Sequence, residues 1–253
     1  MADDAPQRTL SRVTEIGRVA TRHGFGYLLD RRRSGDSEQD GDRGRRLREM
    51  FDELGPTFVK FGQLLSTRPD VVPPDIVVEL QKLQDDVRPF PYEDVERVIG
   101  EELGLSVEQL FTEFEPTPVA AASIGQVHRA TLPNGRRVAV KVQRPNAPRQ
   151  VEADLALMYQ AAKLARERVR ALDFIDARQL VDEFSRSIRQ ELDYRLEARN
   201  AEAFHHRFVG HPHVRIPRVF WSYTRTRVLT LELLEGIQLA DLPLDAWEME
   251  ERR

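Results

Sequence analysis

The feature that most restricts the fold of this chain is a change of hydrophobic period near its centre. Residues 119–145, VAAASIGQVHRATLPNGRRVAVKVQRP, alternate apolar and polar side chains on both sides of Pro-Asn-Gly at 133–135. Because Asn and Gly readily adopt the positive φ angles of tight turns, this pattern predicts a β-hairpin. The second strand has two faces, with Val138, Val140 and Val142 on one and Ala139, Lys141 and Gln143 on the other.

The segments on both sides of the hairpin have the period of helices. Residues 9–29 space their apolar side chains as an amphipathic helix does, and residues 31–46, with no apolar residue, indicate a flexible linker. The pieces 47–55, 57–67, 73–86 and 91–104 are separated by Pro and Gly, which predicts a set of helices. Residues 149–172 and 176–208 contain neither Gly nor Pro and predict two long helices, followed by strands around 214–222 and 227–233.

These elements predict an α+β fold in which a small antiparallel sheet lies beside helices. The order of strand pair, helices and second strand pair is that of the amino-terminal lobe of a protein-kinase fold, here preceded by a helical extension. We divide the chain into a first helix with its linker (1–46), the helical extension (47–115) and the kinase-like lobe (116–253).

Composition and charge exclude several classes of function. The chain has 38 basic and 42 acidic side chains and a net charge of −4, which argues against a nucleic-acid-binding domain with its basic stripe. It has no cysteine, so disulfides, thiolate metal sites and cysteine nucleophiles are excluded. No uncharged apolar run approaches the roughly 20 residues of a membrane-spanning helix, and the start of the chain lacks the apolar core of a signal peptide. We therefore expect a soluble, cytoplasmic protein.

Lysine is scarce, with four residues among the 38 lysines and arginines: Lys60, Lys82, Lys141 and Lys163. A lysine kept in such an arginine-rich chain marks a place where a compact ammonium suits better than a planar guanidinium. Lys141 projects from a short apolar strand, where it could hold phosphate oxygens or simply reach solvent from a sheet edge. Lys60 lies among apolar residues of a predicted helix, which fits either a buried ion pair or a side chain that extends to water. We assign no role to the other two lysines.

Two further segments contain groups that could work with these lysines. The loop 120–125, AAASIG, is rich in small residues but has a single glycine where a kinase phosphate loop has three, and a small turn packed on a helix would look the same. The stretch 187–204, SIRQELDYRLEARNAEAF, carries Glu191, Asp193 and Glu197. On one continuous helix Glu191 and Glu197 would point about 240° apart and need different partners, although a solvated charged face is the simpler interpretation.

Together these motifs resemble the UbiB/AarF-type family of atypical protein-kinase-like proteins. The resemblance covers about residues 47–239. It rests on Lys60-Phe61-Gly62-Gln63 with the following STRPD and PP, on AAASIGQVHRA, on VAVKVQRP and on ELDYRLEARN. The Lys-x-Gly-Gln element and the alanine-rich loop are peculiar to this family, whereas VAVK alone would indicate only a general kinase.

The resemblance implies roles for the matched positions. Lys141 resembles the lysine that contacts nucleotide phosphates, with Glu197 as its partner, and Glu191 is the implied partner of Lys60. The implied nucleotide-binding residues are Ala120, Ala121, Ala122, Ser123, Ile124, Gly125, Ala139, Lys141, Glu197, Glu232 and Leu234. The implied family-specific regulatory residues, whose element folds over the pocket for a peptide substrate, are Lys60, Gly62, Gln63, Glu191 and Asp193. Alanine in place of glycine in the loop is expected to change nucleotide preference and to restrain kinase activity, and residues 232–236 resemble the hinge that holds adenine.

The same resemblance implies ATP or ADP as the cofactor, with Mg²⁺ in a full-length protein, and a role in isoprenoid quinone or lipid metabolism. Besides the nucleotide, it implies a membrane surface or proteins of quinone and lipid biosynthesis as partners, and no nucleic acid. The expected location is cytoplasmic or peripheral at a membrane. No metal ligand and no catalytic residue are predicted within this chain.

Two motifs of the family are absent from the sequence. A catalytic-loop motif of the type His-x-Asp-Pro-x-x-Gly-Asn and an Asp-Phe-Gly motif would follow the hinge, but the chain ends at Arg253. We therefore expect the sequence to be the amino-terminal portion of a longer ATP-dependent atypical kinase or ATPase, without the carboxy-terminal lobe and catalytically incomplete as given. The alternative is a non-catalytic regulatory or interaction module.

Overall fold

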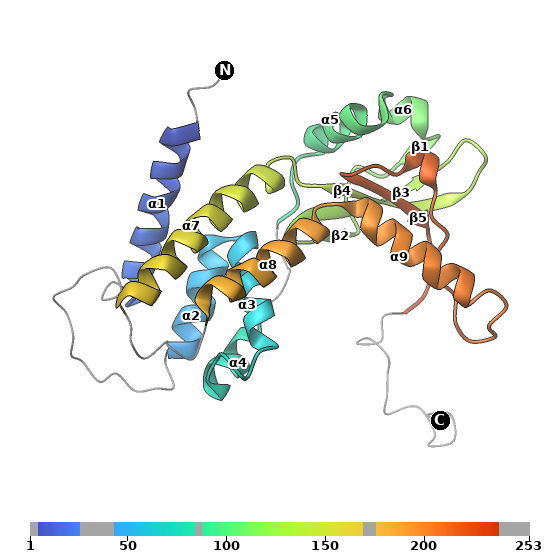
Figure 1. Cartoon of the computed structure of the whole chain (residues 1–253). Helices are drawn as coiled ribbons and strands as arrows, with labels where there is room; N and C mark the ends of the chain where they lie inside the picture. The colour runs from blue at the N-terminus through green and yellow to red at the C-terminus, as the bar shows by residue number, and fades with distance from the viewer. Residues whose placement is uncertain (1–4, 26–42, 84–87, 169–175, 238–253) are drawn as a thin grey trace.

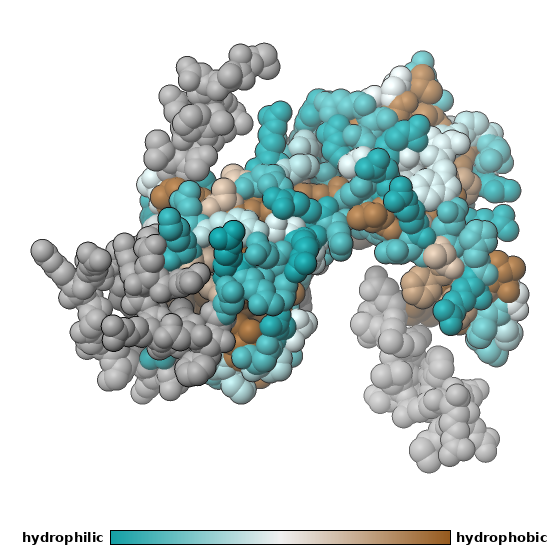
Figure 2. Space-filling view, in the orientation of Figure 1, coloured by the Kyte–Doolittle hydropathy of each residue, from teal (hydrophilic) through white to brown (hydrophobic). Residues whose placement is uncertain are grey.

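The computed structural model describes residues 5–25, 43–83, 88–168 and 176–237 of the chain. Two bodies of secondary structure lie next to each other in Figure 1, a group of helices and a small sheet with its own covering helices. This mixture of helices and an antiparallel sheet confirms the predicted α+β class. In the view of Figure 2 the surface is mainly hydrophilic, with hydrophobic residues in smaller patches.

We call the group of helices the helical body. It consists of α1 (Ala5–Arg22), α2 (Arg43–Leu54), α3 (Pro56–Ser66), α4 (Pro74–Leu80), α7 (Ala147–Arg168) and α8 (Ala177–Glu191). Its hydrophobic core joins helices that are far apart in the sequence, because Phe51 of α2 and Phe58 of α3 lie in one buried cluster with Leu155 of α7 and Phe184 of α8. The apolar stripes of these amphipathic helices are therefore buried against one another.

Proline and glycine determine where several of these helices begin and end. Gly55 has a φ of 93°, and Pro56 is the first residue of α3, where its missing N–H costs no helical hydrogen bond. Pro74 begins α4 in the same way. The first helix ends at Arg22, just before Gly24 with a φ of 83°. The separate helices predicted at 47–55 and 57–67 are confirmed as α2 and α3.

Some predicted boundaries differ from the observed ones. The helix predicted at 9–29 is α1, which starts earlier and ends at Arg22. The helix predicted at 73–86 is α4, which ends at Leu80 and continues as single turns to Leu83. Most of the linker predicted at 31–46 lies outside the described residues, and its last four positions begin α2.

The second body, the sheet body, is built around five strands and three helices among the described residues. They are α5 (Tyr92–Leu103), α6 (Val107–Leu110), β1 (Glu113–Phe114), β2 (Ala120–Ala121), β3 (Gly125–Thr131), β4 (Arg137–Gln143), α9 (Tyr194–Arg207) and β5 (Val228–Glu232). The strands are antiparallel in the order β1-β3-β4-β5, and β2 also pairs with β3. The predicted hairpin is confirmed as β3 and β4, with Gly135 at a φ of 77° in the turn.

The two faces of the sheet pack against different helices. The three valines of β4 are fully buried in one cluster with residues of α5. On the opposite face, Leu229 of β5 packs in a cluster with Ala198 of α9. In Figure 1, α5 and α9 accordingly lie on opposite sides of the sheet. Because side chains alternate along a strand, the side chain of Lys141 is directed toward α9.

The prediction of a single helix over 176–208 is wrong. The segment forms α8 and α9, with Leu192 and Asp193 between them. The carboxylate of Asp193 accepts the backbone N–H of Arg195 and so caps the start of α9. The side-chain amide of Gln143, at the end of β4, donates to the carbonyl of Leu192 at 2.9 Å. The break therefore divides the segment between the two bodies, with α8 in the helical body and α9 in the sheet body.

The strand predicted around 214–222 is also not formed. This segment makes a single bridge between Val219 and Leu231 and then the short 3₁₀ helix η4 (Trp221–Tyr223). Pro217 in this segment has no N–H to donate to a strand ladder, which limits pairing. The strand predicted at 227–233 is confirmed as β5.

The two bodies are interleaved along the chain. Helices α1 to α4 precede the sheet, α7 and α8 follow β4 and return to the helical body, and α9 and β5 complete the sheet body. The domain boundary between 115 and 116 stays a prediction, although the hydrophobic core groups α7 and α8 with the helices that precede that boundary.

Candidate functional site

Lys141 of β4 and Glu197 of α9 are in direct contact, with 2.7 Å between Nζ and Oε2. The register places Lys141 between Val127 of β3 and Leu229 of β5, so β4 is a central strand and Lys141 is not on a sheet edge. The Lys141 side chain is 27% exposed and that of Glu197 47% exposed. The ammonium is therefore held by a carboxylate and still accessible to an anionic ligand.

The aromatic ring of Tyr194 is the second contact of this ammonium. The Lys141 Nζ atom lies 4.7 Å from the ring centroid, within the range of a cation–π interaction. Tyr194 is the first residue of α9 and is fully buried. Burial, followed by the nearby carboxylates of Glu197 and Glu191, raises the pKa of the Tyr194 hydroxyl, which therefore stays neutral.

The alanine-rich loop lies at the start of the same sheet. Its first two alanines form β2, and the N–H of Ala122 donates to the carbonyl of Gly125 at 2.7 Å, which makes a tight turn into β3. Ser123 and Ile124 inside the turn are buried. The Ser123 hydroxyl has no hydrogen-bond partner among the described residues. The loop is thus closely packed at Ser123 and Ile124, whereas Ala120 is exposed and Ala121 and Ala122 are partly exposed.

The strand pairing distributes the remaining predicted nucleotide-binding residues over both faces of the sheet. Ala139 lies on the face of Lys141, and its partner in β5 is Leu231. Glu232 lies opposite Val138, so its side chain points to the other face. Leu234 follows β5 and is partly buried.

Glu232 takes part in a separate polar cluster. Its carboxylate pairs with Arg215 at 2.5 Å and accepts the backbone N–H of Arg218 at 3.3 Å. Burial alone would raise its pKa, but these two contacts outweigh burial and hold the pKa of Glu232 below its usual value. A cavity of about 970 Å³ is lined by Glu232 and these arginines but not by Lys141. A ligand bound at Lys141 could therefore contact the backbone of Glu232 but not its side chain.

The predicted partner of Lys60 is also close to it, but the contact is looser. The distance from Lys60 Nζ to Glu191 Oε2 is 3.6 Å, with the Lys60 side chain 19% and the Glu191 side chain 40% exposed. Lys60 lies on α3, and Glu191 is the last residue of α8. This pair therefore joins two helices within the helical body, whereas the Lys141 pair joins a helix to the sheet.

The next residues of the same motif hold α3 against the segment after α4. A Cβ atom on Gly62 would lie 2.3 Å from Leu83 Cδ1 and 2.7 Å from Cδ2 of Phe51, so the position has no room for a side chain. The Gln63 amide donates to the Leu83 carbonyl at 3.3 Å. Gly62 and Gln63 thus fix the place where the chain leaves the helical body toward α5.

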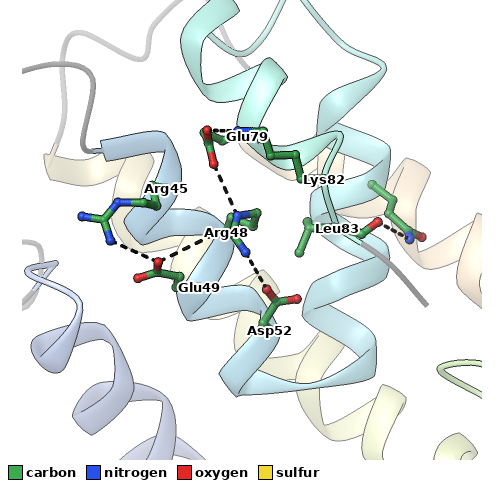
Figure 3. A network of polar contacts seen from close by, with 8 residues as sticks. Arg45, Arg48, Glu49, Asp52, Glu79, Lys82 and Leu83 are labelled. Atoms are coloured by element: carbon green, nitrogen blue, oxygen red, sulfur yellow. Dashed lines mark hydrogen bonds and ion pairs between the residues drawn. The ribbon is translucent and has the colours of Figure 1, made fainter. Parts of the chain in front are cut away.

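A polar network strengthens the same corner of the helical body (Figure 3). Arg48 of α2 pairs with Glu79 of α4 at 3.4 Å and with Asp52 of its own helix at 3.3 Å. Lys82, for which the sequence suggests no role, contacts Glu79. The contact with Lys82 outweighs burial in holding the pKa of Glu79 below its usual value. The network therefore connects α2 to α4 next to Leu83, which Figure 3 also shows.

Asp193, predicted together with Glu191 as a regulatory pair, faces a different neighbour. Its carboxylate is bidentate with Arg195, at 2.8 and 2.7 Å, in addition to capping α9. The hydrogen bond from Arg195 outweighs burial and lowers the pKa of Asp193. Asp193 thus stabilises the start of the helix that carries Glu197.

Sequence reasoning missed two residues of this site. Tyr194 lies within the motif ELDYRLEARN, but no pattern along the chain indicated that its ring would lie beside Lys141. Leu231 shares a face with Lys141 and was assigned no role. A large aromatic residue directly after the capping residue Asp193 was the available signal for Tyr194.

Neither a cluster suited to a metal ion nor a membrane-spanning helix is found among the described residues. No cluster of three or more His, Cys, Asp or Glu side chains there is arranged to hold a metal ion. Of the helices that the structure describes, none is long and apolar enough to cross a bilayer.

The family model for the ABC1 atypical kinase-like domain matches residues 82–252 of the chain. A protein named probable protein kinase UbiB from Marinobacter nauticus is 45% identical over 201 residues, which cover 79% of this chain and 37% of that protein. A protein of the same name from Xanthomonas campestris is 41% identical over 259 residues, which cover 94% of this chain and 46% of that protein. The chain therefore spans less than half the length of these curated relatives.

A solved structure with a similar fold is the complex of Rv3197 with erythromycin from Mycobacterium tuberculosis. The two chains are 33% identical with a TM-score of 0.57, and the match covers 76% of this chain and 48% of the other. The similarity in both sequence and fold agrees with the motifs and the geometry described above.

Proposed function

Because the chain belongs to the ABC1 atypical kinase-like family, as its resemblance to UbiB/AarF-type proteins predicted, we propose that it is the nucleotide-binding portion of an atypical kinase or ATPase. The observation that carries the proposal is the 2.7 Å contact between Lys141 and Glu197, on the face of the sheet that packs against α9. A partly exposed ammonium fixed by a carboxylate is suited to bind phosphate oxygens of ATP or ADP as a point charge.

The surroundings of Lys141 fit a nucleotide. The buried Ser123 hydroxyl in the loop is a hydrogen-bond donor without a partner among the described residues. Ala139 and Leu231 provide an apolar surface on the same face, which suits a planar base. In this proposal Lys141 holds phosphate, the loop 120–125 lies near the phosphates, and the backbone of residues 232–236 holds adenine.

Phosphoryl transfer needs groups beyond those in this chain. ATP supplies the γ-phosphoryl group, and Mg²⁺ bound with it neutralises the phosphate charge. The sequence lacks the catalytic-loop and Asp-Phe-Gly motifs that would hold the metal. We therefore assign to this chain the binding and orientation of the nucleotide, and to a longer protein the metal ligands and the catalytic acid.

The Lys60 element has a regulatory role in this proposal. Gly62 and Gln63 are anchored to Leu83, and Lys60 contacts Glu191 immediately before α9, which carries Glu197. The element can therefore transmit its position to the nucleotide site through the α8–α9 junction. We propose isoprenoid quinone or lipid metabolism as the wider process, with nucleotide and a membrane surface or proteins of that process as partners, and a cytoplasmic or peripheral location.

The proposal is tested by titrating the chain with ATP and ADP, with and without Mg²⁺, using calorimetry. We expect weak binding, above micromolar dissociation constants, because this proposal assigns much of the nucleotide cleft to a lobe that carries the missing motifs. The variant Lys141→Ala should weaken binding about tenfold or more, since a charge-assisted contact is lost. Lys163→Ala, an exposed lysine on α7, is the matched control and should bind as the native chain does.

Two results would contradict the proposal. Absence of any nucleotide binding up to millimolar concentration would argue for the alternative, a non-catalytic interaction module. Binding that is equal in the native chain and in Lys141→Ala would place the nucleotide elsewhere. We expect no ATP turnover by this chain alone, and Mg²⁺-dependent hydrolysis that Lys141→Ala abolishes would show that the chain is catalytically complete.

A further inference from the structure

We propose that Tyr194 is a positioning residue of the nucleotide site. It holds both the ammonium of Lys141 and the backbone at Gly125 in place. The inference rests on the proposed nucleotide-binding function and adds to it a residue that touches no nucleotide. The ring of Tyr194 contacts the ammonium of Lys141, and its hydroxyl contacts the backbone at Gly125.

The hydroxyl of Tyr194 is the first observation. The residue is 0% exposed, and its Oη atom has no hydrogen-bond partner among the described residues. A buried hydroxyl without a partner is unfavourable, and phenylalanine would fill the same space without that cost. The hydroxyl therefore calls for an explanation other than packing of the core.

The backbone at Gly125 supplies that explanation. A Cβ atom on Gly125 would lie 2.3 Å from Tyr194 Oη and 2.7 Å from the carbonyl oxygen of Val142. Gly125 is not among the glycines with a positive φ, so glycine is required here for space and not for conformation. The Tyr194 hydroxyl is therefore in close contact with the first residue of β3, immediately after the alanine-rich loop.

The ring of Tyr194 makes the second contact. It lies 4.7 Å from Lys141 Nζ, and Glu197, which pairs with the same ammonium, follows three positions later on α9. Residues three apart on a helix lie on one side of it, so α9 presents a ring and a carboxylate to one ammonium. The two contacts together fix the ammonium before a phosphate arrives, which favours binding by preorganisation.

The first experiment compares two substitutions of Tyr194 by nucleotide affinity and by thermal unfolding. Tyr194→Leu removes the ring and should weaken ATP or ADP binding about fivefold or more, while Tyr194→Phe keeps the ring and should restore affinity to within about threefold of the native chain. Both variants are compared at temperatures where unfolding curves show them folded. A purely structural role would lower the unfolding midpoint without separating the two affinities, and a folded Tyr194→Leu chain with native affinity would overturn the inference.

The second experiment does not depend on nucleotide binding. Hydrogen exchange of the backbone amides of residues 122–127 is measured in Gly125→Ala, in Tyr194→Phe and in the double variant. Gly125→Ala should speed this exchange about tenfold or more. Tyr194→Phe in the same chain should reverse part of the effect, because the nearer of the two atoms that the new methyl group meets is gone and the Val142 carbonyl oxygen remains. Gly100→Ala on α5, whose Cβ would have no atom closer than 4.0 Å, is the control and should leave the loop unchanged.

The two experiments separate failure of this inference from failure of the proposed function. If the native chain binds no nucleotide, the proposed function fails, and the exchange data alone decide whether Tyr194 positions Gly125. If Lys141→Ala abolishes binding but Tyr194→Leu does not weaken it, the function stands and this inference fails. Additive effects of Gly125→Ala and Tyr194→Phe on exchange would also overturn it, since contacting residues are expected to couple.

Discussion

The helical body and the sheet body each hold a lysine–glutamate pair, and the two pairs are built differently. Lys60, within α3, and Glu191, at the end of α8, lie 3.6 Å apart, while Lys141 and Glu197 lie 2.7 Å apart beside a buried ring. In the sheet body, the pairing of β4 with β3 and β5 fixes the position of the Lys141 backbone. In the helical body, side-chain packing places it.

This difference shows that two similar lysine–glutamate pairs can contribute differently to the structures around them. In the helical body the close contacts are those of Gly62 with Leu83 and the buried pair of Arg12 and Asp154, which join α3 to the segment after α4 and α1 to α7. The Lys60 pair is a looser addition to these contacts. In the sheet body the Lys141 pair itself is the tight contact, which fits a site prepared for a ligand.

Among variants that test this comparison, Asp154→Ala in the helical body is expected to change the free energy of unfolding most. Asp154 is fully buried, and its carboxylate accepts a hydrogen bond from Arg12 Nε at 2.7 Å. The same guanidinium also donates to the Leu54 carbonyl. Removing the carboxylate leaves the largely buried Arg12 guanidinium with the half-exposed Glu15 as its remaining carboxylate partner, and should lower the free energy of unfolding by about 3 kcal/mol. Chemical denaturation measures the change.

The control for Asp154→Ala lies on the same helix. Glu152 makes a bidentate pair with Arg189, but both side chains are about half exposed, at 55% and 51%. Glu152→Ala should therefore cost less than about 1 kcal/mol. Equal losses for the two variants would mean that burial does not distinguish the two ion pairs, and the contrast between core and surface charges would fail.

Replacing two helical glycines by alanine should give the next largest changes in the free energy of unfolding, with opposite signs in the two bodies. Gly62→Ala should destabilise the helical body by about 2 kcal/mol, because the new methyl group meets Leu83 and Phe51 at under 3 Å. Gly100→Ala in α5 has open space and should stabilise the chain by about 0.5–1 kcal/mol through its higher helix propensity. Thermal unfolding of both variants checks the signs. Destabilisation by Gly100→Ala would mean that α5 is packed more closely than the structure indicates.

A buried histidine of the sheet body makes the stability of the chain depend on pH. His128 is fully buried; its Nδ1–H donates to the Glu115 carbonyl at 2.8 Å, and its Nε2 accepts the Gln126 amide at 3.0 Å. Burial outweighs the carbonyl contact and lowers the pKa of His128 below 6.5. The neutral ring is therefore favoured in the folded chain, and its contribution to stability is complete above pH 6.5 and is lost as the pH falls toward the lowered value.

The slope expected from one such histidine is at most about 1.4 kcal/mol per pH unit. Unfolding of the native chain and of His128→Gln is measured between pH 5 and 7.5. The native chain should lose stability below pH 6.5, and the variant should lose less of it over the same range. If both chains lose the same amount, the pH dependence comes from other groups.

The smallest effects are expected from the two lysine–glutamate pairs themselves. A double-mutant cycle with alanine at Lys141 and Glu197 should give a coupling of about 0.5–1 kcal/mol, while the Lys60 and Glu191 cycle should give less than about 0.5 kcal/mol. Both couplings should fall in high salt, because both glutamates are partly exposed. A larger coupling for the Lys60 pair would reverse the comparison between the two bodies.

Local signals predicted most of the fold. The Pro-Asn-Gly turn, the proline at the start of α3 and the buried valines of β4 could all be deduced from neighbouring residues, and each is observed. The partners of Lys60 and Lys141 were also assigned correctly as contacts, although that assignment came from a resemblance and not from periodicity. The roles of these residues in nucleotide binding stay predictions.

Contacts between distant residues account for what the sequence did not predict. The break between α8 and α9 depends on Gln143 of β4, which binds the Leu192 carbonyl, and a run without Gly or Pro gives no sign of it. The contact of Tyr194 with Gly125 likewise joins two segments that are far apart along the chain. Side-chain periodicity describes one element at a time and cannot show which elements meet.

The interleaving of the two bodies has a consequence for synthesis. Helices α1 to α4 leave the ribosome first, yet their core is completed by α7 and α8, which are translated only after the whole β3–β4 hairpin. At about 5–20 residues per second, the apolar faces of the early helices wait for several seconds before their partners exist. Neither body can be expressed as one uninterrupted segment, so dividing this chain into parts would require rejoining pieces in a new order.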